Sequence, residues 1–383
     1  MILVVISVIK NLIAGVILIS RKKYDFAFLI HSRDIRDIYR KYKFARYLPE
    51  SLVNFVALHM WPVFVSSVTG LMSKDGSGRE LHGVVIGLPI TAHQMIEHRE
   101  LALKKIRQAV RLSEKYGAKI VGLGALTSSM SRGGLDLVGT TKTSITTGHA
   151  YTGHTVFSYA RHLTSQLGLD KKNCLVAIVG ATGSIGSITA QLLARDGYIN
   201  FILIDLERKG HKFSEIIDAM LKLSPNAHIL TSHHIIDVRE ADLIVTATNA
   251  PEALIHAGDL KSGAIVIDDA QPSDVALDAL DREDVLIVEA GIVSTPGVSA
   301  NFNFGLKSRT DNFCCLCEVM ILASSDRGGH YVINRATLEQ VDEIAEGGRK
   351  LGFSISRLQN FKEVISDAKI EHVSSIIRNR PRV

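Results

Sequence analysis

The sequence is poor in cysteine and proline, and neither sign of charge dominates it. Its 383 residues include 4 Cys and 8 Pro. So few cysteines exclude a small secreted scaffold built on disulfides, and so little proline excludes collagen-like and low-complexity chains. The 44 Lys and Arg against 39 Asp and Glu give a net charge of +5, which excludes the strongly basic nucleic-acid-binding class. The hydrophobic content of 46% indicates a folded chain, and the length predicts two or three domains.

One long hydrophobic run stands at the start of the sequence. Residues 1–20 read MILVVISVIKNLIAGVILIS and are followed by the basic triplet RKK. This length suits a helix that spans a bilayer, although Lys10 at its centre would cost about 2.5–3.5 kcal/mol there. We expect residues 1–23 to be an apolar extension that contacts a membrane, with the triplet keeping the rest of the chain in the cytoplasm. An interfacial helix, a buried helix and a non-functional extension from an upstream start codon are also compatible with the run.

Strand and helix patterns alternate after this run. Short apolar strands are predicted at 26–30, 83–88 and 119–124, and apolar residues at helical spacing predict a helix over 100–116. A strand, a helix and a strand of these lengths form a βαβ unit, whose strands are parallel. We therefore predict a first α/β domain over residues 24–155.

The second region carries the clearest pattern. A strand at 175–179 runs directly into GATGSIG, and a helix follows. A repeated order of strand, glycine loop, helix and strand predicts a Rossmann-type doubly wound parallel sheet over residues 156–306. Residues 307–383 are predicted as a C-terminal helical region. The further predicted elements are a leading helix at 156–167, strands at 201–204, 243–247, 264–267 and 285–288, and helices at 312–323 and 336–350.

The glycine loop indicates a dinucleotide-binding site because it follows a strand and opens a helix. Gly180 permits the tight turn, Gly183 lets the backbone approach a pyrophosphate, and Gly186 lets the helix pack on the strand. The N-terminus of the helix offers N–H groups to the phosphates. The predicted cofactor-binding residues are Gly180, Thr182, Gly183, Ser184, Ile185, Gly186 and Asp205.

Asp205 ends the second strand of this unit, 19 residues after Gly186. An acidic residue there accepts hydrogen bonds from ribose hydroxyls and disfavours a 2′-phosphate, which favours NAD. Arg208 and Lys209 follow closely and leave NADP open. The predicted cofactor is therefore NAD(P)H, but a Rossmann unit does not by itself determine the chemistry.

Three of the four cysteines stand together in the segment TDNFCCLCE, residues 310–318. A polar residue before them caps a helix, so Cys314 and Cys315 fall in its first turn, where a thiol loses its proton more readily. Glu318 lies one turn further and would oppose this effect. The cysteines are either a covalent nucleophile, metal ligands or small buried residues. No fourth ligand stands within metal-site spacing, so no metal site is predicted.

Six motifs together point to a family. They are LGALTSS (123–129), TTGHAYT (146–152), VGATGSIGS (179–187), IDDAQP (267–272), EAGIV (289–293) and FCCLCEVMIL (313–322). In this order they make the chain resemble the cyanobacterial-type long-chain acyl-[acyl-carrier-protein] reductases, which make fatty aldehydes, as a divergent branch. The resemblance runs from about Asp25 to about Arg357.

The resemblance implies NAD(P)H-dependent reduction of a long-chain acyl thioester to a fatty aldehyde through a cysteine acyl-enzyme. Matching the motif places the nucleophile at Cys315, with Cys314 and Cys317 at positions where the family has small residues. His149 stands where the family usually has Asn. Asp205 stands where the family prefers a small residue followed by Arg. The implied partner is an acyl thioester of acyl carrier protein or coenzyme A.

The candidate catalytic residues are Cys315, His149 and Thr147. A tetrahedral oxyanion on the acyl group needs hydrogen-bond donors, and His149 or His154 would act as an acid. Residues 24–155 would form the acyl-binding domain, in which the apolar stretch 52–65 would line a tunnel, or else be ordinary core or a membrane-facing helix. The basic segment 33–46 is either a solvated helix face or a surface that attracts the acidic carrier protein. The candidate oxyanion donors are Thr127, Ser128, Thr146 and Thr147.

Two other functions fit the same residues. A shikimate- or quinate-type NAD(P) dehydrogenase would use the Rossmann half and would need no cysteine. A non-catalytic nucleotide-binding regulatory protein would use only the glycine loop.

Overall fold

The computed structural model describes residues 23–302 and 304–380, so the predicted membrane extension lies outside the described residues. Contacts divide the chain into two compact units. Unit 1 takes residues up to Gly148, Thr295–Asn334 and Lys350–Gly352. Unit 2 takes His149–Ser294, Arg335–Arg349 and the residues from Phe353 onward. None of the helices in the described ranges is both long and apolar enough to cross a bilayer.

The units differ from the predicted domains at two boundaries. The division at 155/156 moves to 148/149, because His149–Leu167 form one helix, α7, whose buried side chains belong to the core of unit 2. The predicted C-terminal region 307–383 is shared between the units. Its cysteine helix packs on strands of unit 1, while the last helix packs on α7.

Unit 1 is built on a six-stranded sheet with the order β13-β2-β3-β1-β4-β5. Strands β3, β1, β4 and β5 are parallel, and β2 pairs antiparallel with β3. The predicted strands at 26–30, 83–88 and 119–124 are confirmed. Strand β2 was not predicted, because two irregularities in its register with β3 break the alternation of its side chains. The strands are β1 (Phe26–Ser32), β2 (Val63–Met72), β3 (Glu80–Thr91), β4 (Ile120–Leu123), β5 (Ser144–Thr146) and β13 (Ser299–Ala300).

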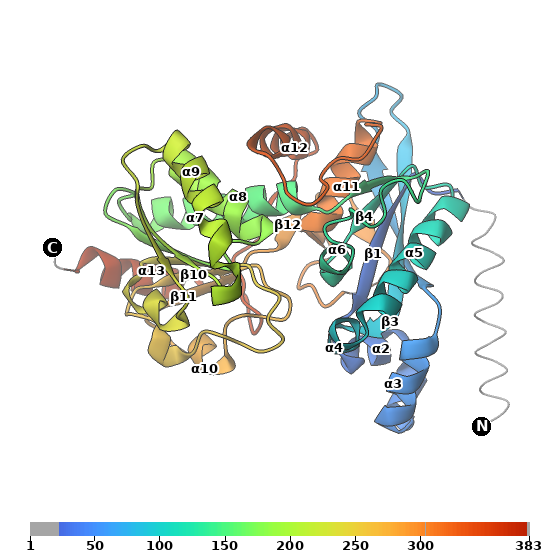
Figure 1. The fold of residues 1–383 in the computed structure, drawn as a ribbon, viewed down its shortest axis with the longest axis horizontal. Helices are drawn as coiled ribbons and strands as arrows, with labels where there is room; N and C mark the ends of the chain where they lie inside the picture. The colour runs from blue at the N-terminus through green and yellow to red at the C-terminus, as the bar shows by residue number, and fades with distance from the viewer. Residues whose placement is uncertain (1–22, 303, 381–383) are drawn as a thin grey trace. The chain divides into compact units, whose positions relative to one another are not determined.

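Helices cover both faces of this sheet (Figure 1). Ala102, Ile106 and Ala109 of α5 pack in the same core as Val121. The next residue of that strand, Gly122, points to the other face, where a side chain would meet Val319 of α11 at 3.2 Å. The helices of unit 1 are α2 (Ile35–Lys41), the 3₁₀ helix η1 (Lys43–Tyr47), α3 (Glu50–His59), α4 (Ala92–Glu97), α5 (Arg99–Lys115), α6 (Leu126–Met130) and α11 (Cys314–Ser324), which follows β14 (Asp311–Phe313).

Unit 2 holds the predicted Rossmann-type sheet. Its six strands are all parallel in the order β8-β7-β6-β9-β10-β11, which is the doubly wound arrangement. The predicted strands are confirmed, and β8 is an additional edge strand, in which only Ile229 and Leu230 are apolar and most side chains are exposed. The strands are β6 (Leu175–Val179), β7 (Asn200–Ile204), β8 (His228–Ser232), β9 (Leu243–Thr246), β10 (Ile265–Asp268) and β11 (Leu286–Glu289).

Helices α8 (Ser184–Arg195) and α9 (Phe213–Leu223) flank this sheet together with α7, and α13 (Asp367–Arg378) packs on α7 and β11 (Figure 1). The architecture is therefore α/β with a Rossmann-like domain and C-terminal helices, as predicted. The remaining elements of unit 2 are α10 (Leu277–Leu280), α12 (Leu338–Lys350, whose last residue falls in unit 1), the 3₁₀ helices η2 (Glu207–Lys212), η3 (Ile235–Glu240) and η4 (Ala257–Asp259), and the antiparallel pair β12 (Ile292–Ser294) and β15 (Ser354–Ile355).

Candidate functional site

Cys315 is the second residue of α11 and is the one cysteine of the four that is not buried. Burial raises the pKa of the Cys317 thiol, and nearby Cys314 and Asp311 raise it further. Burial also raises the pKa of Cys174. A thiol in the first turn of a helix lies at the positive end of the helix dipole, which favours the thiolate. Accessibility and position therefore single out Cys315 as the candidate nucleophile.

The TTG loop, residues Thr146–Gly148, lies against this cysteine. Gly148 has a φ of +81°, and a Cβ atom there would stand 2.4 Å from Cβ and 2.7 Å from Cα of Cys315. Neither the backbone conformation nor the space admits a larger residue. The loop that follows β5 and the start of α11 are thus held in direct contact within unit 1.

A buried carboxylate fastens the same two segments. Oε1 of Glu318 accepts hydrogen bonds from the hydroxyl of Thr146 and, at 3.0 Å, from the backbone N–H of Gly148. Glu318 is fully buried and lies one turn after Cys315 on α11. From the sequence, Glu318 is expected only to affect the thiol. The signal for its structural role is that it is the one charged residue in an otherwise apolar helix.

Thr147 lies between Thr146 and Gly148, the two residues that Glu318 holds. It is buried, and its hydroxyl has no hydrogen-bond partner among the described residues. By contrast, the hydroxyl of Thr127 donates to the carbonyl of Gly124 at 2.7 Å, and that of Thr146 donates to Glu318. Ser128 is buried in α6. Of the predicted threonine donors, Thr147 is therefore the one whose hydroxyl is left for a ligand.

The two candidate histidines belong to α7 of unit 2. His149 is the first residue of that helix and is half-buried. Burial lowers the pKa of His154, and the charge of Asp342 only partly offsets this. A neutral imidazole is thereby favoured at position 154. Within unit 1, the residues brought together are Cys315, the TTG loop and Glu318.

The apolar stretch 52–65 is divided between an exposed helix and a buried strand. Its first half forms α3, and Leu52, Phe55 and Val56 on that helix are exposed. Its second half begins β2, where Val63 is buried. The helix turns its larger apolar side chains outward because Val53 and Ala57 already fill the space beneath it.

The glycine loop of unit 2 has the geometry that a dinucleotide requires. A Cβ atom on Gly180, whose φ is +81°, would stand 2.6 Å from the carbonyl oxygen of Ala247, and one on Gly186 would stand 2.3 Å from that of Gly180. Gly183 precedes α8 and makes no side-chain cap, so no side chain of its own covers the N-terminus of the helix, which is where a phosphate would bind. These residues fit a nicotinamide dinucleotide.

Asp205, predicted to contact the cofactor ribose, also holds the glycine loop. Its carboxylate accepts hydrogen bonds from the backbone N–H and hydroxyl of Thr182, at 2.9 and 2.6 Å, and from the N–H of Leu206. Lys209 lies 3.1 Å from it. Burial alone would raise the pKa of Asp205, but these hydrogen bonds and Lys209 outweigh burial and lower it. The carboxylate thus fastens the glycine loop to the end of β7.

Arg335 was not singled out from the sequence, yet it also supports the glycine loop. Its guanidinium donates to the carbonyl of Thr182 at 3.3 Å and lies 3.4 Å from the carboxylate of Glu215. It brings a cation to a loop expected to bind phosphate. Nothing in its sequence neighbourhood, an INRAT segment after the cysteine helix, marks it for this position.

Two buried carboxyl groups follow β9 and β10, where the IDDAQP motif lies. Asp268 accepts from the hydroxyls of Thr246 and Ser273, both at 2.7 Å, and Asp274 accepts from that of Thr248 at 2.5 Å. Burial raises the pKa of Asp268. Burial, together with the negative charge of Asp268, also raises the pKa of Asp274 to about 6, despite the hydrogen bond from Thr248.

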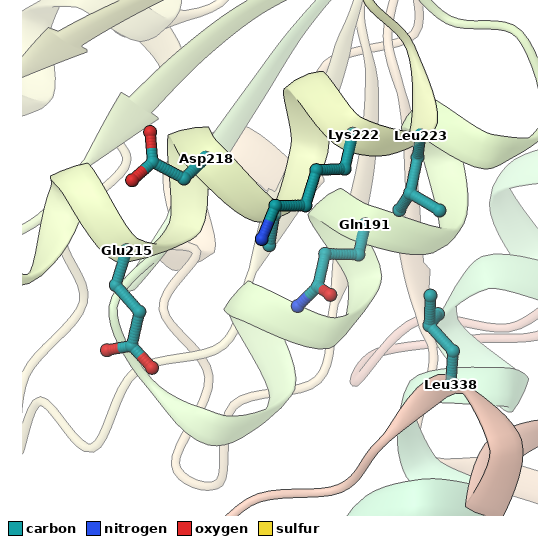
Figure 2. Close-up of a pocket in the computed structure, with 7 residues that line it drawn as sticks. Gln191, Glu215, Asp218, Lys222, Leu223 and Leu338 are labelled. Carbon is teal, nitrogen blue, oxygen red and sulfur yellow. The ribbon is translucent and has the colours of Figure 1, made fainter.

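Figure 2 shows a surface hollow of about 460 Å³ beside α8 and α9 in unit 2. None of the predicted cofactor-binding residues lines it, so it is separate from the glycine loop. Across residues 23–302 and 304–380, no cluster of three or more His, Cys, Asp and Glu side chains is placed to hold a metal ion. The hollow is lined by Gln191, Glu215, Asp218, Ala219, Lys222, Leu223 and Leu338.

Comparison with known proteins identifies the type of domain. Residues 175–288 match the family described as "Semialdehyde dehydrogenase, NAD binding domain". The chain is 23% identical over 339 residues to the long-chain acyl-[acyl-carrier-protein] reductase of Synechococcus elongatus, covering 83% of this chain and 94% of that protein.

A second relative is longer than this chain. The aminotransferase PigE of a Serratia species is 27% identical over 348 residues, covering 89% of this chain but only 38% of that protein. Among solved structures, quinate dehydrogenase from Corynebacterium glutamicum in complex with NAD aligns with a TM-score of 0.38 at 12% identity, covering 86% of this chain and 100% of that one.

The chain therefore contains a dehydrogenase-type domain that binds a nicotinamide cofactor. This agrees with the prediction from the glycine loop. The acyl-[acyl-carrier-protein] reductases are distant relatives, as the motifs implied.

Replacing Glu318 by Ala should destabilise the protein. The change leaves the N–H of Gly148 and the hydroxyl of Thr146 buried without their acceptor, at a cost of about 1–3 kcal/mol for each group. The midpoint of urea unfolding, followed by circular dichroism, should fall. Glu100→Ala, on the exposed face of α5, should leave it unchanged. Equal midpoints for the two variants would show that the carboxylate does not hold the loop.

Asp274 should make stability fall as pH rises from about 4 to about 6. Because its pKa of about 6 lies above the ordinary value of 3.8, the folded chain keeps a proton that the unfolded chain has released across this interval. The contribution of Asp274 to the free energy of unfolding should fall by roughly 3 kcal/mol in total and level off near about pH 7, one unit above its pKa. Asp274→Asn should flatten this dependence in urea titrations at several pH values.

The matched control for this titration is Asp218→Asn, on the exposed side of α9, which should keep the wild-type dependence. If the free energy of unfolding of Asp274→Asn still falls with pH as in the wild type, another group is responsible for the titration.

Proposed function

We propose that this protein reduces a long-chain acyl thioester to a fatty aldehyde with NAD(P)H, through an acyl-enzyme on Cys315. The observation that carries the proposal is the half-exposed Cys315 at the start of α11, in contact with the TTG loop. A distant relative of nearly full-length overlap is named as a long-chain acyl-[acyl-carrier-protein] reductase, which supports the substrate class. The donor would be acyl carrier protein or coenzyme A.

In the first step the thiolate of Cys315 attacks the carbonyl carbon of the thioester. A carbon–sulfur bond forms, the carbonyl π electrons move to oxygen, and a tetrahedral oxyanion results. The hydroxyl of Thr147, which has no partner among the described residues, is the donor that would stabilise this charge, together with N–H groups of the first turn of α11. Collapse of the oxyanion breaks the bond to the carrier sulfur, which leaves as a thiol after taking a proton.

The glycine loop, residues Gly180–Gly186, and the N-terminus of α8 would hold the pyrophosphate of the cofactor. When bound, reduced nicotinamide supplies the hydride that this chemistry requires. Thr182 keeps the loop in shape through Asp205, and Arg335 adds a positive charge beside it. Once the aldehyde has left, Cys315 is again a thiolate, so the cysteine is not consumed.

Glu318 would act as a positioning residue in this scheme. Its hydrogen bonds with Thr146 and Gly148 hold the TTG loop, so its carboxylate fixes where the hydroxyl of Thr147 lies relative to the first turn of α11. Pre-set donors of this kind stabilise a developing charge without having to reorganise during the reaction.

Long-chain acyl-CoA, offered without cofactor, should acylate Cys315. Intact mass spectrometry of the full chain should show one added acyl group with release of coenzyme A. Cys315→Ala should give no adduct, and Cys174→Ala, which changes a buried cysteine elsewhere, should react normally. Aldehyde formation by Cys315→Ala near the wild-type rate would favour a dehydrogenase without covalent catalysis. Absence of any adduct with either thioester donor would favour a nucleotide-binding regulatory protein.

Replacing Thr147 by Val should lower kcat on the order of 10²-fold, which is the effect of losing one oxyanion donor. The same change should not lower stability, because the hydroxyl makes no hydrogen bond within the described chain. Thr147→Ser should restore most of the rate. Thr127→Val is the contrast, since it loses the bond to Gly124 and should destabilise the protein. An unchanged kcat in Thr147→Val would remove this residue from the mechanism.

A further inference from the structure

Helix α3 of unit 1 is apolar on the face that meets the protein and also on the face that meets solvent. Val53 and Ala57 are buried in a small cluster with residues of α2 and η1. On the other side, Leu52, Phe55 and Val56 are exposed at the spacing i, i+3, i+4, with Phe55 61% exposed. Surface helices normally turn a polar face outward, so this second apolar face requires an explanation.

The residues on either side of α3 extend this surface. Tyr47 at the end of η1 is 90% exposed, and Trp61, just after the helix, is 64% exposed. Such a concentration of large apolar side chains on one small structural unit marks an interaction site rather than ordinary surface. We call this set the α3 surface; it consists of Phe44, Tyr47, Leu52, Phe55, Val56 and Trp61.

Two cations stand beside the aromatic side chains in η1, whose sequence is KFARY. Lys43 and Arg46 are exposed, and neither forms an ion pair among the described residues. The neighbouring arginines are already used: Arg33 and Arg40 pair with Asp37, and Arg36 pairs with Asp34. Three arginines against two aspartates leave one net positive charge there, and Lys43 and Arg46 add two more within η1, which also carries Phe44 and Tyr47.

The α3 surface is held firmly by its own unit. The side-chain amide of Gln94 on α4 donates to the carbonyl of Asn54 at 3.1 Å, and Lys105 of α5 donates to the carbonyl of Met60. Figure 1 shows α3 with α2 and α4 at the end of the unit 1 sheet. The apolar side chains thus project from an anchored helix, and their exposure does not come from a loose loop.

We propose that the α3 surface docks this protein on an anionic lipid bilayer. Tryptophan and tyrosine prefer the interface between lipid and water, aliphatic and phenylalanine side chains enter the acyl region, and lysine and arginine bind anionic headgroups. An acidic protein partner fits less well, because six large apolar side chains here outnumber two unpaired cations. The apolar run of residues 1–20 in the same chain is suited to the same environment. The proposal is independent of the chemistry at Cys315.

The chain carries its own probe for this docking, because Trp61 is its single tryptophan. The full-length protein should be mixed with vesicles of phosphatidylcholine containing phosphatidylglycerol. Tryptophan emission should shift to the blue, and brominated acyl chains should quench it. Since the signal comes from Trp61 alone, it reports this surface even where residues 1–20 also bind the vesicles.

Two sets of variants test the two contributions. The double variant Lys43→Glu with Arg46→Glu should bind the vesicles more weakly, with an affinity lowered at least about fivefold for each residue. Its binding should no longer depend on phosphatidylglycerol. Phe55→Ser with Val56→Ser should weaken it on vesicles of either composition. The matched controls are Arg111→Glu, an exposed cation on α5, and Leu277→Ser, a 78% exposed leucine of unit 2. Both controls should behave as the wild type.

Four results would overturn the proposal. Vesicles that bind the protein without shifting or quenching Trp61 would place the lipid contact elsewhere. Shielding of Trp61 that depends on protein concentration without lipid would assign the surface to a second copy of the chain. Shielding that is complete in dilute, lipid-free protein would assign it to another segment of the same chain. Protection by acyl carrier protein but not by vesicles would assign it to an acidic protein.

Discussion

The hydrogen bonds that Glu318 accepts are the interaction on which the candidate site depends. The carboxylate is removed from solvent, so its charge needs partners, and it finds them in the hydroxyl of Thr146 and the N–H of Gly148. These partners belong to the loop after β5, while Glu318 belongs to α11. The hydrogen bonds that stabilise the buried charge therefore also fix the loop relative to the helix. Without this link, the contact between Gly148 and Cys315 would rest on packing alone.

Hydrogen bonds between a buried carboxyl group and a threonine also occur at the carboxyl ends of the strands in unit 2. Asp205 holds Thr182 of the glycine loop, Asp268 holds Thr246 after β9, and Asp274 holds Thr248. In each pair a buried carboxyl group fastens a threonine beside a turn. Loops at this edge of parallel strands carry the ligands in α/β proteins, and their positions must be fixed although few apolar contacts are available. Buried carboxyl–threonine pairs supply that rigidity here.

The sequence predicted those parts of the fold that depend on local patterns. Continuous apolar strands such as Leu175–Val179 and the glycine loop were recognised because their signals lie within a few neighbouring residues. Strand β2 was missed because its register irregularities depend on the partner strand. Hydropathy does not say which side of a helix is already filled, so the exposure of Leu52 could not be predicted from the apolar stretch. The hydrogen bonds of Asp205 to Thr182 could not be predicted either, since the direction of a carboxylate depends on what surrounds it.

The choice among the three clustered thiols follows from helix geometry. Successive residues on an α-helix are turned by about 100°, so Cys314 and Cys317 fall on nearly the same side, and Cys315 projects from a different one. The first two are buried and the third is half-exposed. Burial raises the pKa of Cys317, which keeps that thiol protonated and unreactive. The CCLC pattern thus separates one accessible sulfur from two buried ones, and it does so in the first turn of α11, against the TTG loop.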